Sequence, residues 1–499
     1  MGGRFGTFVS GVRGRDWATP VVLAATLFLL LASVARAFST LPLSSADEPA
    51  HVDYALRVWQ GQLPQLLDGL RFEPGFGARV PVQWVAQHPP LFYLLLAPVV
   101  GPLVDADHPL QAVLAARLVD AVLVALVVPA AAWAAARCFP GARRLPATVA
   151  VVAASTPLLV VQGGVVYNDS LSALVGVLGC GVAGAALRSG VTTRLLVWGS
   201  VVAAAGMATR LSFALWFVAI VVAFLLARSV RVPRLRGVWG RVLVALGPVV
   251  AAAAASGWFY VRNEILTGSF SGRPKPWPGS TPRPKIPESV VVRTKGFWQQ
   301  LGALYRGALD VNGALPWVLL LVPVVLALVG LVVVAVVVLR RRSTAVGRVS
   351  DGERWPRALV VAMFVVVLLL YVVVEIRYVA GGGAPNSRYT LGVLMPVLLV
   401  VAAGLRCVER AAVVLVPAWS LTTAVAIWSL FDGAGNALVA HSGTVVVGAS
   451  AAAGVLGVLT LVLFVVGELR TVWSRGGTGA AGADDADGTQ RIAARSTAR

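Results

Sequence analysis

The sequence is poor in charge, in lysine and in cysteine. Charged residues make up 13% of its 499 residues, whereas a soluble protein carries about 25%. Hydrophobic residues make up 58%, and the mean hydropathy is +0.81. These values exclude an ordinary soluble domain and predict an all-α polytopic membrane protein.

Lysine is nearly absent, so arginine supplies almost all of the basic charge. The only lysines are Lys275, Lys285 and Lys295. We attribute this bias to a GC-rich genome, typical of actinobacteria, and give it no functional weight. The net charge of +20 does not indicate a nucleic-acid partner, because in a membrane protein the informative property is the side on which the arginines lie.

Several metal and nucleotide motifs are also missing. The three cysteines lie in or beside apolar runs, which excludes a disulfide framework and a thiolate zinc site. The sequence contains no GxxxxGK[ST], HExxH or CxxC motif, and the spacing of its four histidines matches no closed zinc site. We therefore expect no cofactor and no metal ion, with a divalent metal as the open alternative.

What the sequence does contain is a series of apolar runs, most of them close to the length of about 20 residues that crosses a bilayer. Twelve are expected to span the membrane: 19–38, 110–136, 147–165, 170–187, 195–209, 212–227, 242–261, 315–339, 358–376, 390–405, 411–430 and 444–467. A further run, 91–104, is shorter, and we interpret it as an interfacial or re-entrant piece.

The arginines support this count. With the N-terminus inside, the Arg-rich loops all fall on the inner side, as the positive-inside rule requires. Counting 91–104 as a span would place these loops outside. We therefore expect a multi-pass protein of the cytoplasmic membrane with both termini in the cytoplasm. Cleavage after Ala35-Arg36-Ala37, which resembles a signal-peptidase site, would leave eleven spans, but an uncleaved first span is favoured.

This topology predicts one transmembrane domain, 1–467, followed by a tail, 468–499. The tail is rich in Gly, Ala and Asp and is expected to be disordered in the cytoplasm. Two large outer loops are expected, 39–108 and 262–315. The basic, proline-rich stretch 273–295 of the second loop fits a cover over an anionic substrate and a solvated linker equally well.

The first outer loop contains SSADEPAHVDY, residues 44–54, a cluster of carboxylates in a chain that has few. Proline is favoured in the first turn of a helix, so Pro49 predicts an amphipathic, interfacial helix with Glu48 as its N-cap. Asp47 is then expected to point into a cavity, with His51 one turn later. The alternative is that the stretch is only a helix start.

Other outer turns carry polar residues that would singly be typical of structural roles. They are His88, Asp169, Arg210, Arg262, Arg388 and Tyr389. Together they place acids, histidine and arginine on one side of the membrane, which suits an anionic phosphate and a leaving group that needs charge stabilisation. Within the spans, Asp120 and Glu375 are functional candidates by position, although an ion pair between Asp120 and Arg117 is the simpler account.

The ordered motifs resemble integral-membrane type C glycosyltransferases. The acidic pair after the first span is followed by HPPLFY, NDSLSAL, a T-[K/R] turn, WFYVRN and NSRYTLGVLMP. They cover the chain from Asp47 to about Pro396. The sequence is most similar to actinobacterial relatives of protein O-mannosyltransferase and aminoarabinose transferase that carry a DEPAH-type motif.

The resemblance implies transfer of a sugar from a polyprenyl-phosphate-linked donor to a glycan, lipid or protein acceptor outside the cytoplasmic membrane. Asp47 would be the general base, and Glu48 and Asp169 would complete the catalytic set. Substrate-binding residues would be His51, His88, Arg210, Arg262, Arg388 and Tyr389. The alternatives are a transporter or lipid-linked-sugar flippase, which would place charges along a path through the bilayer, and a non-catalytic relative.

Overall fold

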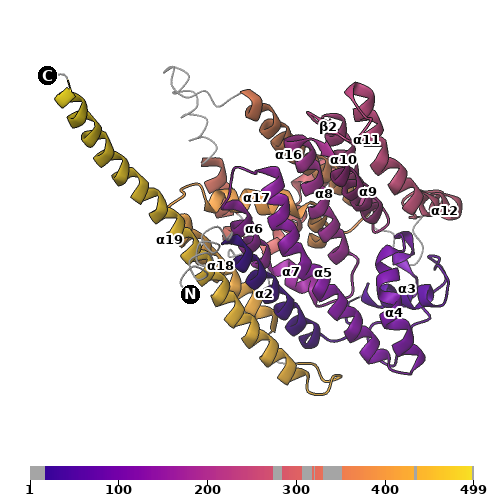
Figure 1. The fold of residues 1–499 in the computed structure, drawn as a ribbon. Coiled ribbons are helices and arrows are strands. Elements are labelled where there is room, and N and C mark those ends of the chain that lie inside the picture. Colours follow the sequence, from indigo (N-terminus) through magenta and orange to yellow (C-terminus); the bar gives the residue numbers. More distant parts are fainter. Residues whose placement is uncertain are drawn as a thin grey trace, which may run out of the picture.

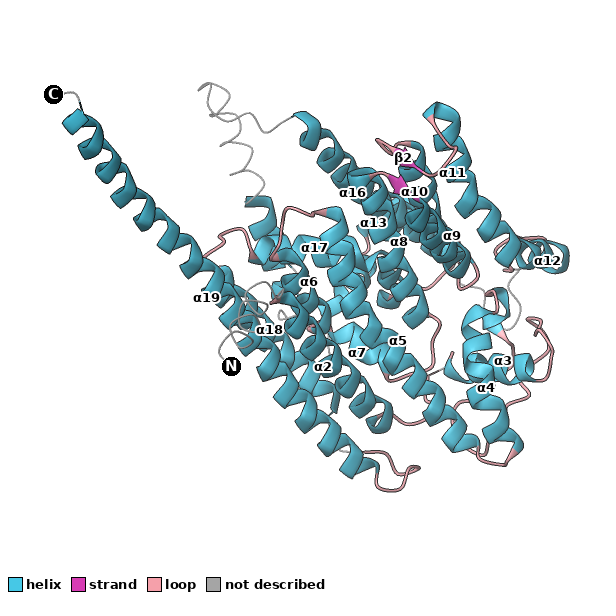
Figure 2. Ribbon diagram, viewed as in Figure 1, coloured by secondary structure: helices cyan, strands magenta, loops and turns pink. Residues whose placement is uncertain are grey.

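Helices make up most of the chain that the structure, a computed structural model, describes (Figures 1 and 2). The described residues are 17–45, 47–273, 284–305, 317–319, 321–329, 351–431 and 435–496. The chain is therefore the all-α polytopic type that its composition predicts.

The elements follow one another with short connections. The first half contains α2 (Ala18–Ser39), α3 (Glu48–Trp59), η1 (Trp84–Gln87), α4 (Leu91–Asp105), α5 (Pro109–Cys138), α6 (Leu145–Ala154), α7 (Pro157–Gly163), α8 (Asp169–Ser189), β1 (Val191–Thr192), α9 (Thr193–Met207), η2 (Leu211–Phe213), α10 (Ala214–Leu225), β2 (Val230–Arg231), α11 (Gly237–Ala252), η3 (Ala253–Gly257) and α12 (Trp258–Thr267). The second half contains α13 (Glu288–Arg293), α14 (Lys295–Gly302), η4 (Ala303–Tyr305), α16 (Asp351–Ala380), η5 (Ser387–Val393), α17 (Leu394–Leu405), α18 (Ala412–Trp428), η6 (Ser429–Phe431) and α19 (Ser442–Ser496).

The helix α5 lies at the centre of the bundle and packs against α2, α4, α6, α7 and α8. Along one edge α19 runs beside α2, so the first and last described helices are neighbours (Figure 1). Near the end of this edge the buried Glu468 pairs with Arg406 at 2.7 Å and with Arg144 at 3.1 Å. This ion-pair group ties α19 to the ends of α17 and α6, and removing one partner of such a buried group is costly.

Within the described residues the apolar runs are confirmed as helices; residues 315, 316, 320 and 330–339 of the run 315–339 lie outside the described part of the chain. Eight described helices are long and apolar enough to cross a membrane, or nine if the bent pair α6–α7 is one span. Three shorter apolar helices, Thr193–Met207, Leu211–Leu225 and Trp317–Val329, coincide with the remaining predicted spans. The helix α4, within the run interpreted as interfacial, has 15 residues and contains Pro98 and Pro102.

The bend between α6 and α7 measures 58°. It arises where Thr156 adopts an extended conformation before Pro157, the first residue of α7. Proline has no N–H to donate to the preceding turn and disfavours helical geometry in the residue before it. The sequence therefore breaks this apolar run into two helices.

The helix predicted at Pro49 is confirmed as α3, but its boundary and surroundings differ from expectation. The N-cap residue is Asp47, Glu48 is the first helical residue, and neither side chain caps the helix. All residues from Glu48 to Arg57 are buried, because α3 packs on α4 and residues 60–87 fold over it. The polar side chains of α3 are thus enclosed by protein.

The last helix, α19, extends to Ser496, and the disorder of the tail 468–499 stays a prediction. Alanine recurs through this segment, and it has the highest helix propensity of any residue.

Candidate functional site

Four segments that are far apart in the sequence meet at one end of the bundle. Asp47 is the N-cap of α3, and Asp169 is the first residue of α8. Arg210 directly precedes η2, and Arg388 lies in η5. Each residue sits where the chain turns into a helix, at the level where backbone N–H groups lack helical partners. The polar side chains therefore gather at the helix starts.

An alternating set of charges joins these four residues, which we call the Asp47 cluster. Arg388 pairs with Asp47, and Arg210 pairs with Asp169. The Nε atom of Arg388 also lies 3.7 Å from Asp169 Oδ2, so the order is Asp47, Arg388, Asp169, Arg210. The exposed fraction of the side chain is 27% for Asp47, 14% for each arginine and 4% for Asp169. Asp47 is thus the more accessible of the two carboxylates.

Aromatic rings hold the two guanidinium groups in place. The guanidinium carbon of Arg388 lies 4.7 Å from the ring centre of Tyr167 and 5.5 Å from that of Tyr389. The guanidinium carbon of Arg210 lies 5.3 Å from the centre of the same Tyr389 ring. Tyr389 in turn packs edge-on against Tyr378. Cation–π contacts of this kind favour charged guanidinium groups in sites with little water.

Tyr167 also connects the cluster to the start of α3. Its hydroxyl donates a hydrogen bond to Ser45. Burial raises the pKa of this phenol to about 12, so the ring remains neutral at physiological pH. The sequence pattern singled out Asp169 of the Tyr-Asn-Asp turn. It did not single out Tyr167, which lies two residues before Asp169 and packs under Arg388.

The two predicted histidines lie beside the cluster and are neutral. The Nδ1 atom of His51 is 3.0 Å from the Tyr93 hydroxyl, and its ring packs edge-on against Tyr167. His88 is half-buried, and among the described residues its imidazole makes no hydrogen bond. Burial lowers the pKa of both histidines well below the ordinary value, and the charges of Arg210 and Arg388 lower it further.

Glu48 does not join the Asp47 cluster, in contrast to its predicted catalytic role. Its side chain is fully buried and accepts four hydrogen bonds. Oε1 receives Arg117 Nε at 2.7 Å and Val166 N at 3.1 Å, and Oε2 receives Arg117 Nη2 at 2.8 Å and Leu43 N at 2.9 Å. With both oxygens occupied, Glu48 is a structural carboxylate beside Asp47.

The expected ion pair between Arg117 and Asp120 is wrong. Arg117 uses its remaining donors on three backbone carbonyls at the end of α2 and just after it, those of Ala37, Thr40 and Leu41. Asp120 instead accepts a hydrogen bond of 3.0 Å from the backbone N–H of Tyr167. Asp120 therefore positions the turn that carries Tyr167 and Asp169.

Arg262 also lies outside the cluster, and its predicted substrate-binding role stays a prediction. Its Nη2 donates to the carbonyl of Pro64 at 2.9 Å and of Leu63 at 3.4 Å. The neighbouring Asn263 donates to the carbonyl of Gln87 at 3.1 Å. The outer end of α12 thus fastens the segment that covers α3.

Asp53, in the same acidic stretch, organises this covering segment. It is fully buried and accepts hydrogen bonds from Arg57 at 2.9 Å and Gln83 at 2.7 Å, and from the backbone N–H groups of Arg71 and Phe72. The three acids and the histidine of SSADEPAHVDY therefore divide between framework and cluster. Sequence spacing alone does not separate the two groups.

No metal-binding group is apparent in the part of the chain that the structure describes. There, no three residues of the types His, Cys, Asp and Glu lie close enough together to share an ion. The positive charge beside Asp47 and Asp169 comes from Arg210 and Arg388.

Comparison with known proteins finds similarity at the level of fold. No protein-family model and no curated protein sequence matches the chain. Among solved structures, the apo oligosaccharyltransferase of Archaeoglobus fulgidus matches at a TM-score of 0.43 and 14% identity, covering 91% of this chain and 56% of that protein. The chain thus spans little more than half the length of the archaeal enzyme.

Apo ArnT from Cupriavidus metallidurans matches at a TM-score of 0.45 and 15% identity, covering 90% of this chain and 76% of that protein. ArnT bound to undecaprenyl phosphate matches at 0.42 and 13% identity, covering 90% and 77%. At identities of 13–15% and TM-scores below 0.5, these matches assign no activity to the chain and no role to any residue.

Proposed function

We propose that the chain transfers a sugar from a polyprenyl-phosphate-linked donor to a cell-envelope acceptor, with Asp47 as the general base. The observation that carries the proposal is the Asp47 cluster, in which four distant segments bring two carboxylates and two arginines together at the helix ends. A donor carried by a lipid needs no nucleotide-binding loop, and the sequence has no such motif.

The arginines supply what the leaving group requires. A sugar transferred from a lipid phosphate leaves behind an anionic phosphate, which guanidinium groups bind through paired N–H donors. Arg388 and Arg210 both lie against the Tyr389 ring, so one phosphate could bridge them. The phosphate would then replace the Asp47 carboxylate as the anion bound to Arg388.

The reaction then follows from the charges. The carboxylate of Asp47 accepts the proton of the acceptor hydroxyl as the oxygen attacks the anomeric carbon. The bond between the anomeric carbon and the phosphate oxygen breaks, and polyprenyl phosphate departs with the electron pair. Arg388 and Arg210 stabilise the charge that develops on that phosphate. Attack opposite the leaving group inverts the anomeric configuration.

Exposure distinguishes the roles of the carboxylates. A general base must reach a second substrate, and Asp47 has 27% of its side chain exposed against 4% for Asp169. Asp169 instead holds both arginines and is a positioning residue. Neutral His88, half-buried beside the arginines, would donate a hydrogen bond to the phosphate. His51 would support the phosphate site through its contact with the Tyr93 hydroxyl.

The cluster favours an enzyme over a transporter or flippase. A transport path requires charged groups spaced through the bilayer, whereas these four residues lie together at helix starts. The distribution of arginine in the loops supports an orientation in which this end lies outside the cytoplasmic membrane and both termini lie inside. The acceptor would be a glycan, lipid or protein of the envelope.

The test is the variant Asp47→Asn expressed in a host from which the wild-type gene has been removed. Removing a general base typically slows a reaction by 10²–10⁴-fold, so mass spectrometry of the envelope glycans should show loss of one sugar. The matched control is Glu73→Gln, since Glu73 is an exposed acid in the same segment.

Protein abundance in the membrane is measured alongside, because Asp47 is partly exposed and its replacement should leave folding intact. Unchanged glycans in Asp47→Asn at normal abundance would refute the assignment of the base. Equal loss in the Glu73→Gln control would show that the segment tolerates no change and would also contradict the specific role of Asp47.

A further inference from the structure

A second polar site lies at the opposite end of α8 from the Asp47 cluster. The helix carries Asp169 at its first residue and Arg188 and Ser189 at its end. Its 21 residues at 1.5 Å per residue separate the two sites by about 30 Å, close to the thickness of a bilayer core. The second site therefore lies near the other membrane surface.

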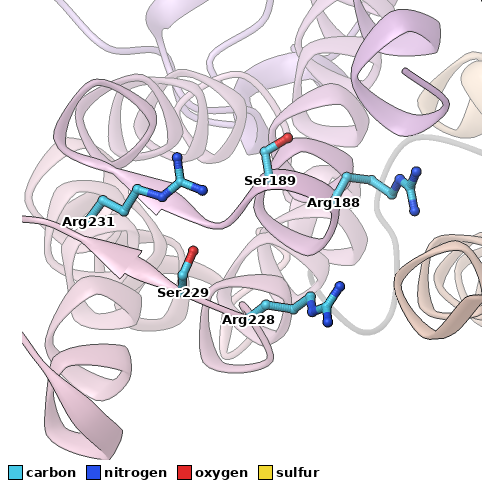
Figure 3. Close-up of a pocket in the computed structure, with 5 residues that line it drawn as sticks. All are labelled: Arg188, Ser189, Arg228, Ser229 and Arg231. Atoms are coloured by element: carbon cyan, nitrogen blue, oxygen red, sulfur yellow. The ribbon is translucent and has the colours of Figure 1, made fainter. Parts of the chain in front are cut away.

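The site is a cavity of about 490 Å³ built by the end of α8 and by the segment 228–231, which includes β2 (Figure 3). Its lining residues are Arg188, Ser189, Arg228, Ser229 and Arg231. The two serines lie between Arg231 on one side and Arg188 and Arg228 on the other (Figure 3). Among the described residues that line it, three are cationic and none is acidic.

A short parallel ladder fixes the distance between these two segments. β1 pairs with β2 through Val191 opposite Val230, and the N–H of Val191 donates to the carbonyl of Ser229 at 2.9 Å. Gly190 has a φ of +81°, and a Cβ atom there would overlap Ser229. Glycine is thus required for the close approach, and the cavity has a defined floor.

The basic surface continues toward α11. A second cavity shares Arg228 and Ser229 with the first and is also lined by Arg236, Gly237 and Arg241. Val238 and Trp239 follow directly and are 71% and 78% exposed. Tryptophan is enriched where a membrane meets water, so a cationic cavity and a membrane-facing apolar surface adjoin each other.

We infer that this cavity binds the phosphate headgroup of an anionic glycerophospholipid, with the acyl chains lying along α11. Serine hydroxyls and guanidinium groups are the donors that bind phosphate oxygens. A water occupies about 30 Å³ of liquid, so 490 Å³ exceeds what one free phosphate needs and accommodates a glycerol phosphodiester. Arginines that serve only to orient a membrane protein would not need to line one cavity from two segments, the end of α8 and residues 228–231.

The experiment uses the full chain in detergent, with bound lipid counted by native mass spectrometry. The wild type should retain phosphatidylglycerol in preference to phosphatidylcholine. Each arginine near an anionic lipid changes its affinity by about fivefold, so Arg188→Gln/Arg231→Gln should bind phosphatidylglycerol about 25-fold more weakly. The charge-matched control, Arg143→Gln/Arg410→Gln, removes two exposed arginines of other loops and should bind as the wild type does.

A third variant changes the space in the cavity and leaves its charge unchanged. Ser189→Leu keeps every arginine and fills the cavity, so it should lose phosphatidylglycerol while melting at the wild-type temperature. Equal weakening by the control pair would overturn the proposal, because it would show a general effect of charge. Displacement of phosphatidylglycerol by inorganic phosphate at similar concentration would also overturn it, since the site would then hold a free anion.

Discussion

Replacing Glu48 by glutamine should destabilise the fold, although its neighbour Asp47 can be changed to asparagine without that effect. Each oxygen of Glu48 accepts two N–H donors, one from Arg117 and one from the backbone. Whichever oxygen becomes the amide nitrogen, two donors then face an N–H₂ group. Arg117 also loses the charge that balances its own in a site with no exposure.

The magnitude follows from burial. Breaking a buried ion pair from one side costs about 3–5 kcal/mol. One kcal/mol shifts Tm by about 2–4 °C in chains of 150–250 residues, and by roughly half as much in a chain twice that length. Glu48→Gln should therefore melt about 3–10 °C below the wild type, whereas Asp47→Asn and the exposed control Glu73→Gln should melt within about 1 °C of it.

The assay is thermal unfolding of the purified protein in detergent, followed by tryptophan fluorescence. A wild-type Tm for Glu48→Gln would refute the structural role assigned to this carboxylate. So would a variant that folds with normal stability and yet transfers no sugar, because Glu48 would then act in the chemistry.

Three further predictions concern the cluster. Arg388→Lys should weaken binding of undecaprenyl phosphate about tenfold, since lysine lacks the paired donors of guanidinium; unchanged binding in a titration would contradict the phosphate role. Burial holds the pKa of His51 and His88 below 6.5, so the unfolded chain binds more protons than the folded one below about pH 6.5 and Tm should fall as the medium is acidified. His51→Gln should show a shallower fall, and an identical profile would argue against it. Transfer should survive EDTA, because Arg210 and Arg388 supply the positive charge; a loss restored by Mg²⁺ would contradict this.

The helices and the convergence of the cluster could be predicted because each depends on a local property. Apolar length predicts a span, and the arginine distribution predicts which helix ends share a side. These two properties together bring Asp47, Asp169, Arg210 and Arg388 to one level of the bundle. Their order as an alternating set of charges depends on side-chain packing, which no local pattern describes.

The differences from expectation have a common cause in partners that are distant along the chain. Arg117 and Asp120 have the spacing of a helical pair, but Glu48, 69 residues from Arg117, and three backbone carbonyls satisfy the arginine better. Arg262 similarly binds loop carbonyls almost 200 residues away. A charged residue at a helix end is equally suited to a substrate or a loop, and only the tertiary fold decides between them.

The contact of Arg388 with Asp47 has a consequence for the order of events in the proposed reaction. While Arg388 holds Asp47, the carboxylate has less room for an acceptor hydroxyl. A donor phosphate that takes over Arg388 would release it. Turnover would then be sequential, with the donor binding first. Free polyprenyl phosphate would inhibit competitively with respect to the donor and would not compete directly with the acceptor. The same contact would shield the site of the activated sugar from water until the lipid-linked donor has bound.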